Sequence, residues 1–351
     1  MKVEVILKKR NNKTFITTTM SKPLICVTGG SGYIALHVCR ILVQSDKYTV
    51  RCTVRSKSPE KTDYLESIGV EIFDNCDLLV DGSFDKAFDG CKYVVHCASP
   101  FFFKAPGGDG NNFVKPALEG TKNVCNSIDK AGTVERLVLT SSCAAVAWQD
   151  SSKHPDAANG PVWTEDDWQM DSTLEKGAYR LSKRLAELAA WEYVNGNDKI
   201  TMAVINPSFV LGPTLTPRFI GASIGFQKSL IDGSTTKLTP SGFGCVDVRD
   251  VANAHVNALT VDLEQEGLKN KRGEARFILS SEVGVSRTEI AKILKASGKF
   301  DQYPIPLEVD GDDVPLAKYS HARAEKYLNI KFTPVEQTII DGAQSIADML
   351  K

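Results

Sequence analysis

A tyrosine and a lysine lie four positions apart in the segment YRLSKRLAELAAWEYV, at Tyr179 and Lys183. At this spacing both side chains lie on one face of a helix, one turn apart. A free tyrosine is a poor acid at neutral pH, but a nearby ammonium favours the phenolate. We therefore expect Lys183 to lower the pKa of Tyr179, so that the phenol can give its proton to a carbonyl oxygen.

Hydroxyl side chains end an apolar, strand-like segment earlier in the chain, at Thr140-Ser141-Ser142. We expect the hydroxyl of Ser142 to hydrogen-bond the carbonyl oxygen and to polarise it as negative charge develops. Ser141 is the adjacent alternative. A strand end followed by a tyrosine–lysine pair on a helix is also compatible with a purely structural role. The next motif favours the catalytic interpretation.

A glycine-rich turn, residues 28–35, connects the apolar segment PLICV to a segment with helical periodicity. Glycine permits a tight turn and close approach of the backbone to a pyrophosphate, which rests on the N-terminus of the helix. A turn between a strand and a helix, at the start of a series of such pairs, is typical of a dinucleotide site. The contacts expected here are Gly29, Ser31, Gly32, Tyr33 and Ile34.

The second strand indicates which dinucleotide binds. In NAD-binding proteins an acidic residue about twenty positions after the turn holds the ribose hydroxyls, and the segment TVRSK contains none. Arg55 and Lys61 are placed to meet a 2′-phosphate, although either could be an ordinary surface cation. The sequence therefore predicts NADP, with NADPH preferred over NADH. We expect Asp77 and Leu78 near the adenine, and Ala98 and Ser99 along the dinucleotide.

From Pro23 onward, short apolar runs alternate with helical segments, and these elements must position the motifs. Such repetition predicts an α/β fold with a Rossmann-type doubly wound parallel sheet. After residue 205 glycine and proline become frequent and the periodicity weakens. We expect an NADP-binding Rossmann domain over 21–205, with 246–262 returning to it. A smaller C-terminal α/β substrate lobe then comprises 206–245 and 263–351, with the ligand crevice between the two.

Composition limits the classes of function. A net charge of −1 gives no electrostatic reason to expect nucleic acid or an anionic membrane as a partner. No apolar run is long enough to span a bilayer. The cysteines form no CxxC pair and the histidines show no metal-ligand spacing, so we expect no metal site and a reducing, cytoplasmic location. Residues 1–20, basic and threonine-rich, are expected to be a disordered extension; a transit peptide is the alternative.

These motifs resemble those of the extended short-chain dehydrogenase/reductases. Over 22–335 the chain is similar to the branch that holds dihydroflavonol 4-reductases, cinnamoyl-CoA reductases and fungal aldehyde (methylglyoxal-type) reductases. The segment TLEKGA before Tyr179 lacks the NWYCYGK pattern of cinnamoyl-CoA reductases, and YIALH is closer to the FIAQH of the fungal enzymes. The motifs that carry the resemblance are TGGSGYIA, TVRS, CDL, CASP, TSSCAAV, YRLSKRLAELAAWE, NPSFVLGP and VDVRDVANAH.

The resemblance implies roles for individual residues. Ser142, Tyr179 and Lys183 would be catalytic. Asn123 would support a proton-relay water. The implied cofactor contacts are Arg55 and Lys61 to phosphate, and Pro207 and Val210 to the nicotinamide. The residues themselves suggest that Phe101–Phe103 and the segment 213–230 shape the substrate pocket. For Phe101–Phe103 the equal alternative is that they anchor the glycine-rich loop after them to the core.

We therefore expect an NADP-dependent oxidoreductase that reduces an aldehyde or ketone to an alcohol, as a monomer or a homodimer. An NAD(P)-dependent epimerase/dehydratase or a steroid-type dehydrogenase on the same fold is one alternative. Arg55, in place of an acidic residue, argues against a sugar-nucleotide epimerase. A non-catalytic NADP-sensing regulatory protein is the other alternative, and the intact tyrosine–lysine pair argues against it. The carbonyl substrate stays open.

Overall fold

The computed structural model of the chain describes residues 3–10, 13–99, 109–219, 221–263, 268, 274–311 and 315–351. Its largest element is a seven-stranded sheet in the order β13-β9-β7-β6-β3-β4-β5, with every neighbouring pair parallel. The predicted fold class is confirmed. The strands are β3 (Leu24–Thr28), β4 (Thr49–Thr53), β5 (Glu71–Phe73), β6 (Tyr93–His96), β7 (Arg136–Thr140), β9 (Thr201–Pro207) and β13 (Arg276–Leu279).

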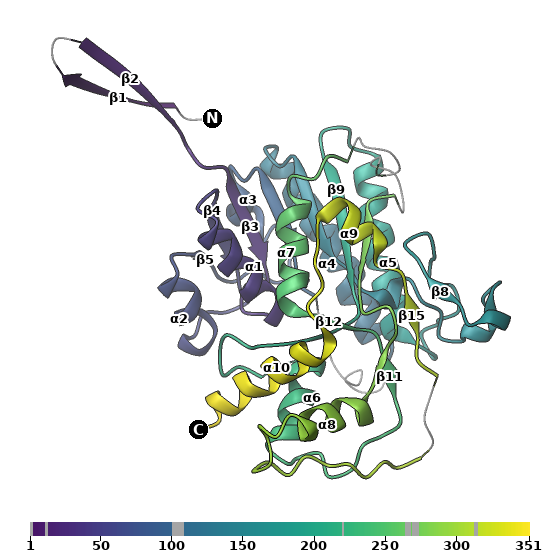
Figure 1. The fold of residues 1–351 in the computed structure, drawn as a ribbon. Coiled ribbons are helices and arrows are strands. Elements are labelled where there is room, and N and C mark those ends of the chain that lie inside the picture. The colour runs from purple at the N-terminus through teal and green to yellow at the C-terminus, as the bar shows by residue number, and fades with distance from the viewer. Residues whose placement is uncertain are drawn as a thin grey trace.

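Helices cover both faces of this sheet (Figure 1). On one face α1 (Tyr33–Gln44) packs against α7 (Val248–Ala258), and on the other α4 (Asn111–Ala131) packs against α5 (Ala178–Asn195). Strands buried on both sides are continuous apolar runs in sequence, which is why these segments lack an alternating pattern. Two shorter helices, α2 (Pro59–Ser67) and α3 (Asp85–Phe88), follow β4 and β5.

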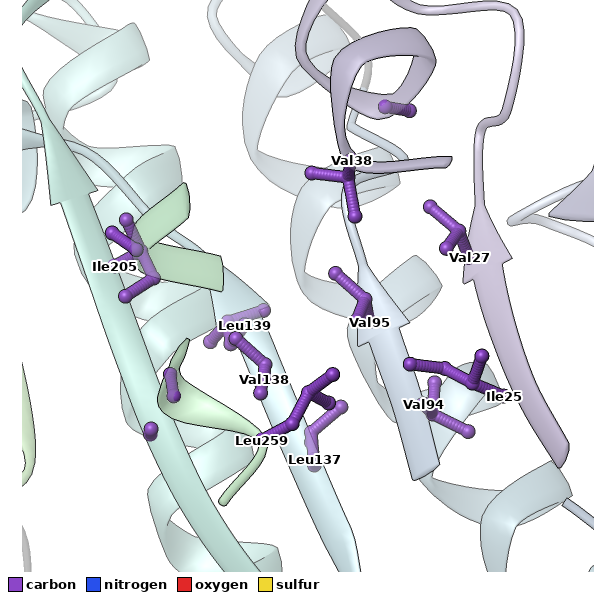
Figure 2. Close-up of a cluster of buried hydrophobic side chains, with 14 of the residues drawn as sticks. Ile25, Val27, Val38, Val94, Val95, Leu137, Val138, Leu139, Ile205 and Leu259 are labelled. Atoms are coloured by element: carbon purple, nitrogen blue, oxygen red, sulfur yellow. The ribbon is translucent and has the colours of Figure 1, made fainter. Parts of the chain in front are cut away.

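Figure 2 shows the centre of the core, between β3 and β9. Val38 of α1 points toward Val27 and Val95 on two neighbouring strands, and all three are fully buried. Leu259, directly after α7, lies beside Leu137 of β7. The helices are therefore fixed to the sheet by close apolar packing, which gives the strand ends a rigid base.

The direction of the chain across the sheet reverses at its centre. From β3 the chain continues outward to β4 and β5, whereas from β6 it continues the other way to β7 and β9. The connections after β3 and β6 therefore diverge at their carboxyl ends. In open α/β sheets this switch point is where ligands bind.

Below the carboxyl edge of the sheet lies a second, smaller apolar cluster that includes Leu211, Leu230, Phe300 and Ile346. It is built mainly from helices and two-stranded sheets of the segments expected to form the substrate lobe. The helices are α6 (Ala222–Ile231), α8 (Arg287–Ala296) and α10 (Val335–Met349). The paired strands are β10 (Phe209–Leu211) with β12 (Cys245–Asp247), and β11 (Gly242–Phe243) with β14 (Val285–Ser286).

One part of the expected domain division differs from the structure. The sequence predicts that 263–351 belongs to the substrate lobe, but β13 joins the large sheet beside β9, and α9 (Ala322–Leu328) packs against β13 and α7. The run ARFIL is apolar enough for a buried strand, but nothing local in it specifies which sheet it joins. A further parallel pair, β8 (Val162–Trp163) with β15 (Lys318–Tyr319), and the short helices η2 (Cys143–Ala145), η3 (Ser151–Lys153) and η4 (Ala157–Asn159) complete the fold.

In place of the disordered extension expected for 1–20, the structure has an antiparallel hairpin of β1 (Val3–Arg10) and β2 (Lys13–Met20). It projects away from the body of the molecule (Figure 1). The β-branched run TFITTT favours strands, which explains the difference. Among the described residues no helix is long and apolar enough to cross a membrane. All nine cysteines are unpaired thiols, and eight of them are buried.

Candidate active site

The turn after β3 has a backbone that requires glycine at two positions. Gly29 has a φ of 69°, and a Cβ there would lie 2.9 Å from the Cα of Ala98. A Cβ at Gly30 would lie 2.5 Å from the Sγ of Cys52. A larger side chain at either position would push the turn away from the strands β4 and β6.

Helix α1 begins directly after this turn. Its N-cap, Gly32, has no side chain to cap the helix, and the first turn contains no acidic residue. The first N–H groups of a helix have no partner within the helix, so they form a site for an anion such as a pyrophosphate. Gly29, Gly32, Tyr33 and Ile34 line a cavity of about 770 Å³.

Arg218 is a cation at this turn that the sequence analysis missed. It donates from Nη1 to the carbonyl oxygen of Ser31 at 2.7 Å, and its Nε lies 3.7 Å from a carboxylate oxygen of Glu60. The guanidinium therefore adds positive charge beside the anion site formed by α1. Arg218 comes from the loop before α6, 187 positions from Ser31, so no local spacing could indicate the contact.

Ser142 lies where β7 ends and η2 begins. Its Oγ accepts a hydrogen bond from the backbone N–H of Ala144 at 3.1 Å and donates to the carbonyl oxygen of Pro207 at 3.5 Å. The same hydroxyl lies close enough to Tyr179 to lower the pKa of its phenol. All four residues line the 770 Å³ cavity, which the glycine turn also lines.

Tyr179 and Lys183 occupy the first two turns of α5 and face this cavity. The ring of Phe113 on α4 meets the Tyr179 ring edge-on, with the centroids 6.1 Å apart. The Nζ of Lys183 lies 5.6 Å from the centroid of the Tyr179 ring and donates to the Oγ of Ser99 at 2.8 Å. The predicted four-residue spacing therefore brings both side chains to one wall.

The protonation of this pair differs from the expectation. We expected Lys183 to lower the pKa of Tyr179, but burial raises the pKa of Tyr179 to about 12, against the lowering effects of the Ser142 hydrogen bond and of Arg180. Burial also lowers the pKa of Lys183 to about 8. The sequence argument considered the ammonium and omitted the cost of taking the phenolate out of water. At neutral pH the phenol keeps its proton.

Ser141 also lines the cavity, but its hydroxyl belongs to a buried polar network. Its Oγ donates to Oε2 of Glu187 at 2.5 Å, and Asn206 donates to the same oxygen from Nδ2 at 3.0 Å. The other carboxylate oxygen of Glu187 accepts from Nε of Arg276 at 2.6 Å. Glu187 lies one turn beyond Lys183 on α5, so the network joins the helix that carries the catalytic pair to the ends of three strands.

The other expected cofactor contacts fall into two groups. Pro207 and Val210 line the 770 Å³ cavity together with Ser99. Four further residues do not line this cavity: Ser31, Arg55, Lys61 and Asp77. Arg55 is exposed, and Lys61 donates to the Oγ of Ser56 at 2.6 Å. Asp77 accepts from the backbone N–H of Leu79 at 2.9 Å.

Leu78 and Ala98 line a second cavity, of about 20 Å³, behind Lys183. Asn123 lies near it, but its Nδ2 donates to the carbonyl oxygen of Leu78 at 2.8 Å, so this amide is used in holding the loop after β5. Among the described residues no group of His, Cys, Asp and Glu side chains could hold a metal ion.

The remaining walls of the larger cavity come mostly from the smaller lobe. Phe209 and Phe243 contact each other with their ring centroids 4.2 Å apart, and both line it. Gly221, Ala222 and Ser223, from the segment 213–230, also line this cavity. Phe101–Phe103 lie outside the described residues. The cavity is also lined by Arg180, Ser208 and Tyr319, for which no motif in the sequence indicates a role.

Comparison with known proteins shows the family of this chain. A model of the NAD dependent epimerase/dehydratase family matches residues 25–268. Cinnamoyl-CoA reductase CAD2 of Medicago truncatula is 36% identical over 332 residues, which cover 93% of this chain and 96% of that protein.

Two solved structures are similar over nearly the whole chain. Gre2 of Candida albicans, in complex with NADPH, is 29% identical with a TM-score of 0.76, and the match covers 94% of this chain and 100% of that one. The yeast methylglyoxal/isovaleraldehyde reductase Gre2, also complexed with NADPH, is 29% identical with a TM-score of 0.74, over 93% of this chain and 99% of that one. The chain thus belongs to the NAD dependent epimerase/dehydratase family, and within it to the extended short-chain dehydrogenase/reductases.

Proposed function

We propose that this protein is an NADPH-dependent reductase that converts an aldehyde or ketone into an alcohol. The observation that carries the proposal is that Ser142, Tyr179 and Lys183 line one cavity together with the glycine turn. Membership of the family supports it, as do the reductase names of the similar proteins and the NADPH bound to two of them.

The residues present fit a nicotinamide dinucleotide. The uncapped N-terminus of α1 and the bare backbone at Gly29 suit the pyrophosphate, with Arg218 beside them. In this proposal Arg55 and Lys61 hold the 2′-phosphate of NADPH, because the segment TVRSK at the end of β4 contains no acidic side chain to favour the free ribose of NADH. The further contacts that we assign are Asp77, Leu78, Ala98, Ser99, Pro207 and Val210. When bound, NADPH supplies a hydride.

The chain's own residues supply the proton and the polarisation. Tyr179 donates its phenolic proton to the carbonyl oxygen as the carbonyl carbon gains the hydride, so that C=O becomes CH–OH. The Ser142 hydroxyl donates a hydrogen bond to the same oxygen and stabilises the charge that develops on it. The raised pKa of Tyr179 keeps the proton available at neutral pH, and the Lys183 ammonium stabilises the tyrosinate that remains.

The test follows NADPH oxidation by absorbance with a panel of aldehydes, diketones and aromatic ketones. We expect turnover by the wild type and at least about a hundredfold loss of kcat in Tyr179→Phe. Tyr193→Phe is the matched control, because Tyr193 lies on the same helix with its hydroxyl bonded to Asp129, outside the cavity. If NADPH binds but the wild type reduces no carbonyl, the reductase proposal is wrong and the epimerase or sensor alternatives take its place.

A further inference from the structure

Arg180 directly follows the proposed proton donor in sequence and lines the same cavity. Its Nη1 donates to the carbonyl oxygen of Ala147 at 2.9 Å, which anchors the guanidinium against the segment after η2. Within the described part of the chain, Arg180 forms no ion pair with a carboxylate. One edge of the guanidinium is therefore fixed, and its other N–H groups can donate to an acidic ligand.

The charges around the cavity have one sign. Of the described side chains that line it, only Arg180 and Lys183 are charged, and no aspartate or glutamate is among them. In the proposed function Lys183 acts on Tyr179, whereas no step of that reaction requires Arg180. Arg180 is partly buried, and a ligand that fills the cavity would take more of its guanidinium out of water. A ligand that brings a negative charge to this position would therefore be favoured over a neutral one.

Two further hydroxyl groups belong to the same wall. Tyr319 is only 8% exposed, and in the described part of the chain its hydroxyl has no hydrogen-bond partner. The Oγ of Ser208 is also buried without a partner. The two side chains are neighbours, since a Cβ on Gly244 would lie 2.9 Å from the Cβ of Ser208 and 2.9 Å from Cε2 of Tyr319. A buried hydroxyl without a partner is rare in proteins, and the Oγ of Ser208 is one. The Tyr319 hydroxyl is not among the fully buried atoms, and its residue lines the cavity, so both groups favour a polar ligand there.

These groups are close to the reacting atoms and remote from the phosphate turn. The charge of Arg180 lowers the pKa of both Tyr179 and Tyr319, against the stronger raising effect of burial, so the guanidinium lies near both phenols. Figure 1 shows β8 and β15, the pair that carries Tyr319, on the other side of the molecule from α1. The phosphates of a dinucleotide on α1 therefore do not account for Arg180.

We propose that Arg180, with the hydroxyl groups of Tyr319 and Ser208, binds a carboxylate on the substrate, so that the protein reduces oxo acids in preference to neutral carbonyl compounds. This inference rests on the proposed reductase function. The planar guanidinium matches a carboxylate in geometry, and hydrogen bonds between charged groups are the strong ones. The carboxylate also gives the substrate a fixed orientation, because its other polar end, the carbonyl oxygen, is held by Ser142 and Tyr179.

The experiment compares 2-, 3- and 4-oxo acids with their methyl esters, at saturating NADPH. For the wild type we expect a higher kcat/KM on one acid than on its ester. In Arg180→Gln the acid-to-ester ratio of kcat/KM should fall at least about tenfold, mostly through KM, because binding is what the carboxylate contact contributes. Arg180→Lys should restore part of the ratio.

Arg184→Gln is the matched control. Arg184 lies one turn further along α5, and its Nη1 likewise donates to a backbone carbonyl, that of Gln169 at 2.7 Å, but it does not line the cavity. The acid-to-ester ratio of kcat/KM in Arg184→Gln should equal that of the wild type. Tyr319→Phe provides a second test in case the arginine variant folds poorly, since that hydroxyl has no partner in the described part of the chain to lose. We expect it to lower the same ratio.

The possible outcomes distinguish a failure of the carboxylate site from a failure of the proposed reductase function. If esters and other neutral carbonyls are reduced with NADPH but no acid is preferred, or if Arg180→Gln and Tyr319→Phe leave the ratio unchanged, the carboxylate site is wrong and the reductase stands. A preference for phosphorylated carbonyls over carboxylated ones overturns it too. If no carbonyl of any kind consumes NADPH, the reductase function itself fails.

Discussion

Glu187 and Arg276 form an ion pair in which both side chains are fully buried, with Nε 2.6 Å from Oε1. Arg276 also donates to the backbone carbonyls of Glu165 and Asp167, and its guanidinium lies 3.9 Å from the centroid of the Trp168 ring. The pair therefore connects the last strand of the sheet to α5 and to the loop before it. Tyr179, Lys183 and Glu187 lie along one face of α5. The buried contacts of Glu187 therefore fix the position of the helix that presents Tyr179 and Lys183 to the cavity.

The first prediction concerns this pair. Glu187→Gln preserves the shape of the side chain and leaves the Arg276 guanidinium buried without its counter-charge. Breaking a buried pair in this way costs about 3–5 kcal/mol of the free energy of unfolding, which urea denaturation measures. The control is Glu135→Gln, which breaks the exposed pair of Glu135 with Lys92 at 3.1 Å; we expect a change below about 1 kcal/mol. Equal losses in the two variants would contradict the prediction.

The second prediction concerns Lys183, whose pKa burial lowers from its usual 10.5 to about 8. Below pH 8 the lysine is charged in both the folded and the unfolded state, and its burial costs stability in full. Between pH 8 and 10.5 the unfolded state binds more protons than the folded state, so stability rises with pH. Lys183→Met removes this dependence.

Urea denaturation of the wild type and Lys183→Met at pH 7 and pH 10 tests this directly. From pH 7 to pH 10 the wild type should gain roughly 2–3 kcal/mol relative to the variant. If the difference in unfolding free energy between the two proteins is the same at both pH values, Lys183 titrates at its ordinary pKa in the folded protein.

The third prediction separates two adjacent serines. Ser142→Ala removes the hydroxyl that contacts Tyr179 in the cavity, so kcat should fall by about a hundredfold or more while NADPH still binds. Ser141→Ala instead removes a donor to Glu187, and we expect a loss of about 1–3 kcal/mol in unfolding free energy with a much smaller effect on kcat. Steady-state kinetics and urea denaturation of both variants provide the comparison. The reverse pattern would assign the catalytic hydroxyl to Ser141.

The sequence predicts those features whose geometry is set by near neighbours in the chain. A helix places Lys183 one turn from Tyr179 whatever surrounds it, and a turn between a strand and a helix needs glycine at Gly29 for local steric reasons. The parallel sheet follows from alternating elements in the same way, because each crossover has one allowed hand.

Contacts between segments that are distant in the sequence could not be predicted from such local patterns. Glu187 and Arg276 are 89 positions apart, and Arg218 reaches Ser31 across 187. The raised pKa of Tyr179 was missed for a related reason, since burial depends on what the whole fold places around the ring. The strand β13 was assigned to the wrong part of the molecule because an apolar run does not specify its neighbours.

The last prediction distinguishes the two groups of cations proposed to hold the cofactor. Arg55 and Lys61 follow β4, where only NADPH carries a phosphate, so Arg55→Ala and Lys61→Ala should raise KM for NADPH by about tenfold and leave KM for NADH unchanged. Arg218 lies at the turn that would hold the pyrophosphate, a group that both dinucleotides share, so Arg218→Ala should raise both KM values by a similar factor. Titration of cofactor fluorescence with NADPH and with NADH measures the same difference without turnover. If Arg218→Ala weakened the binding of NADPH alone, the guanidinium would belong to the 2′-phosphate site, and its assignment to the pyrophosphate would be wrong.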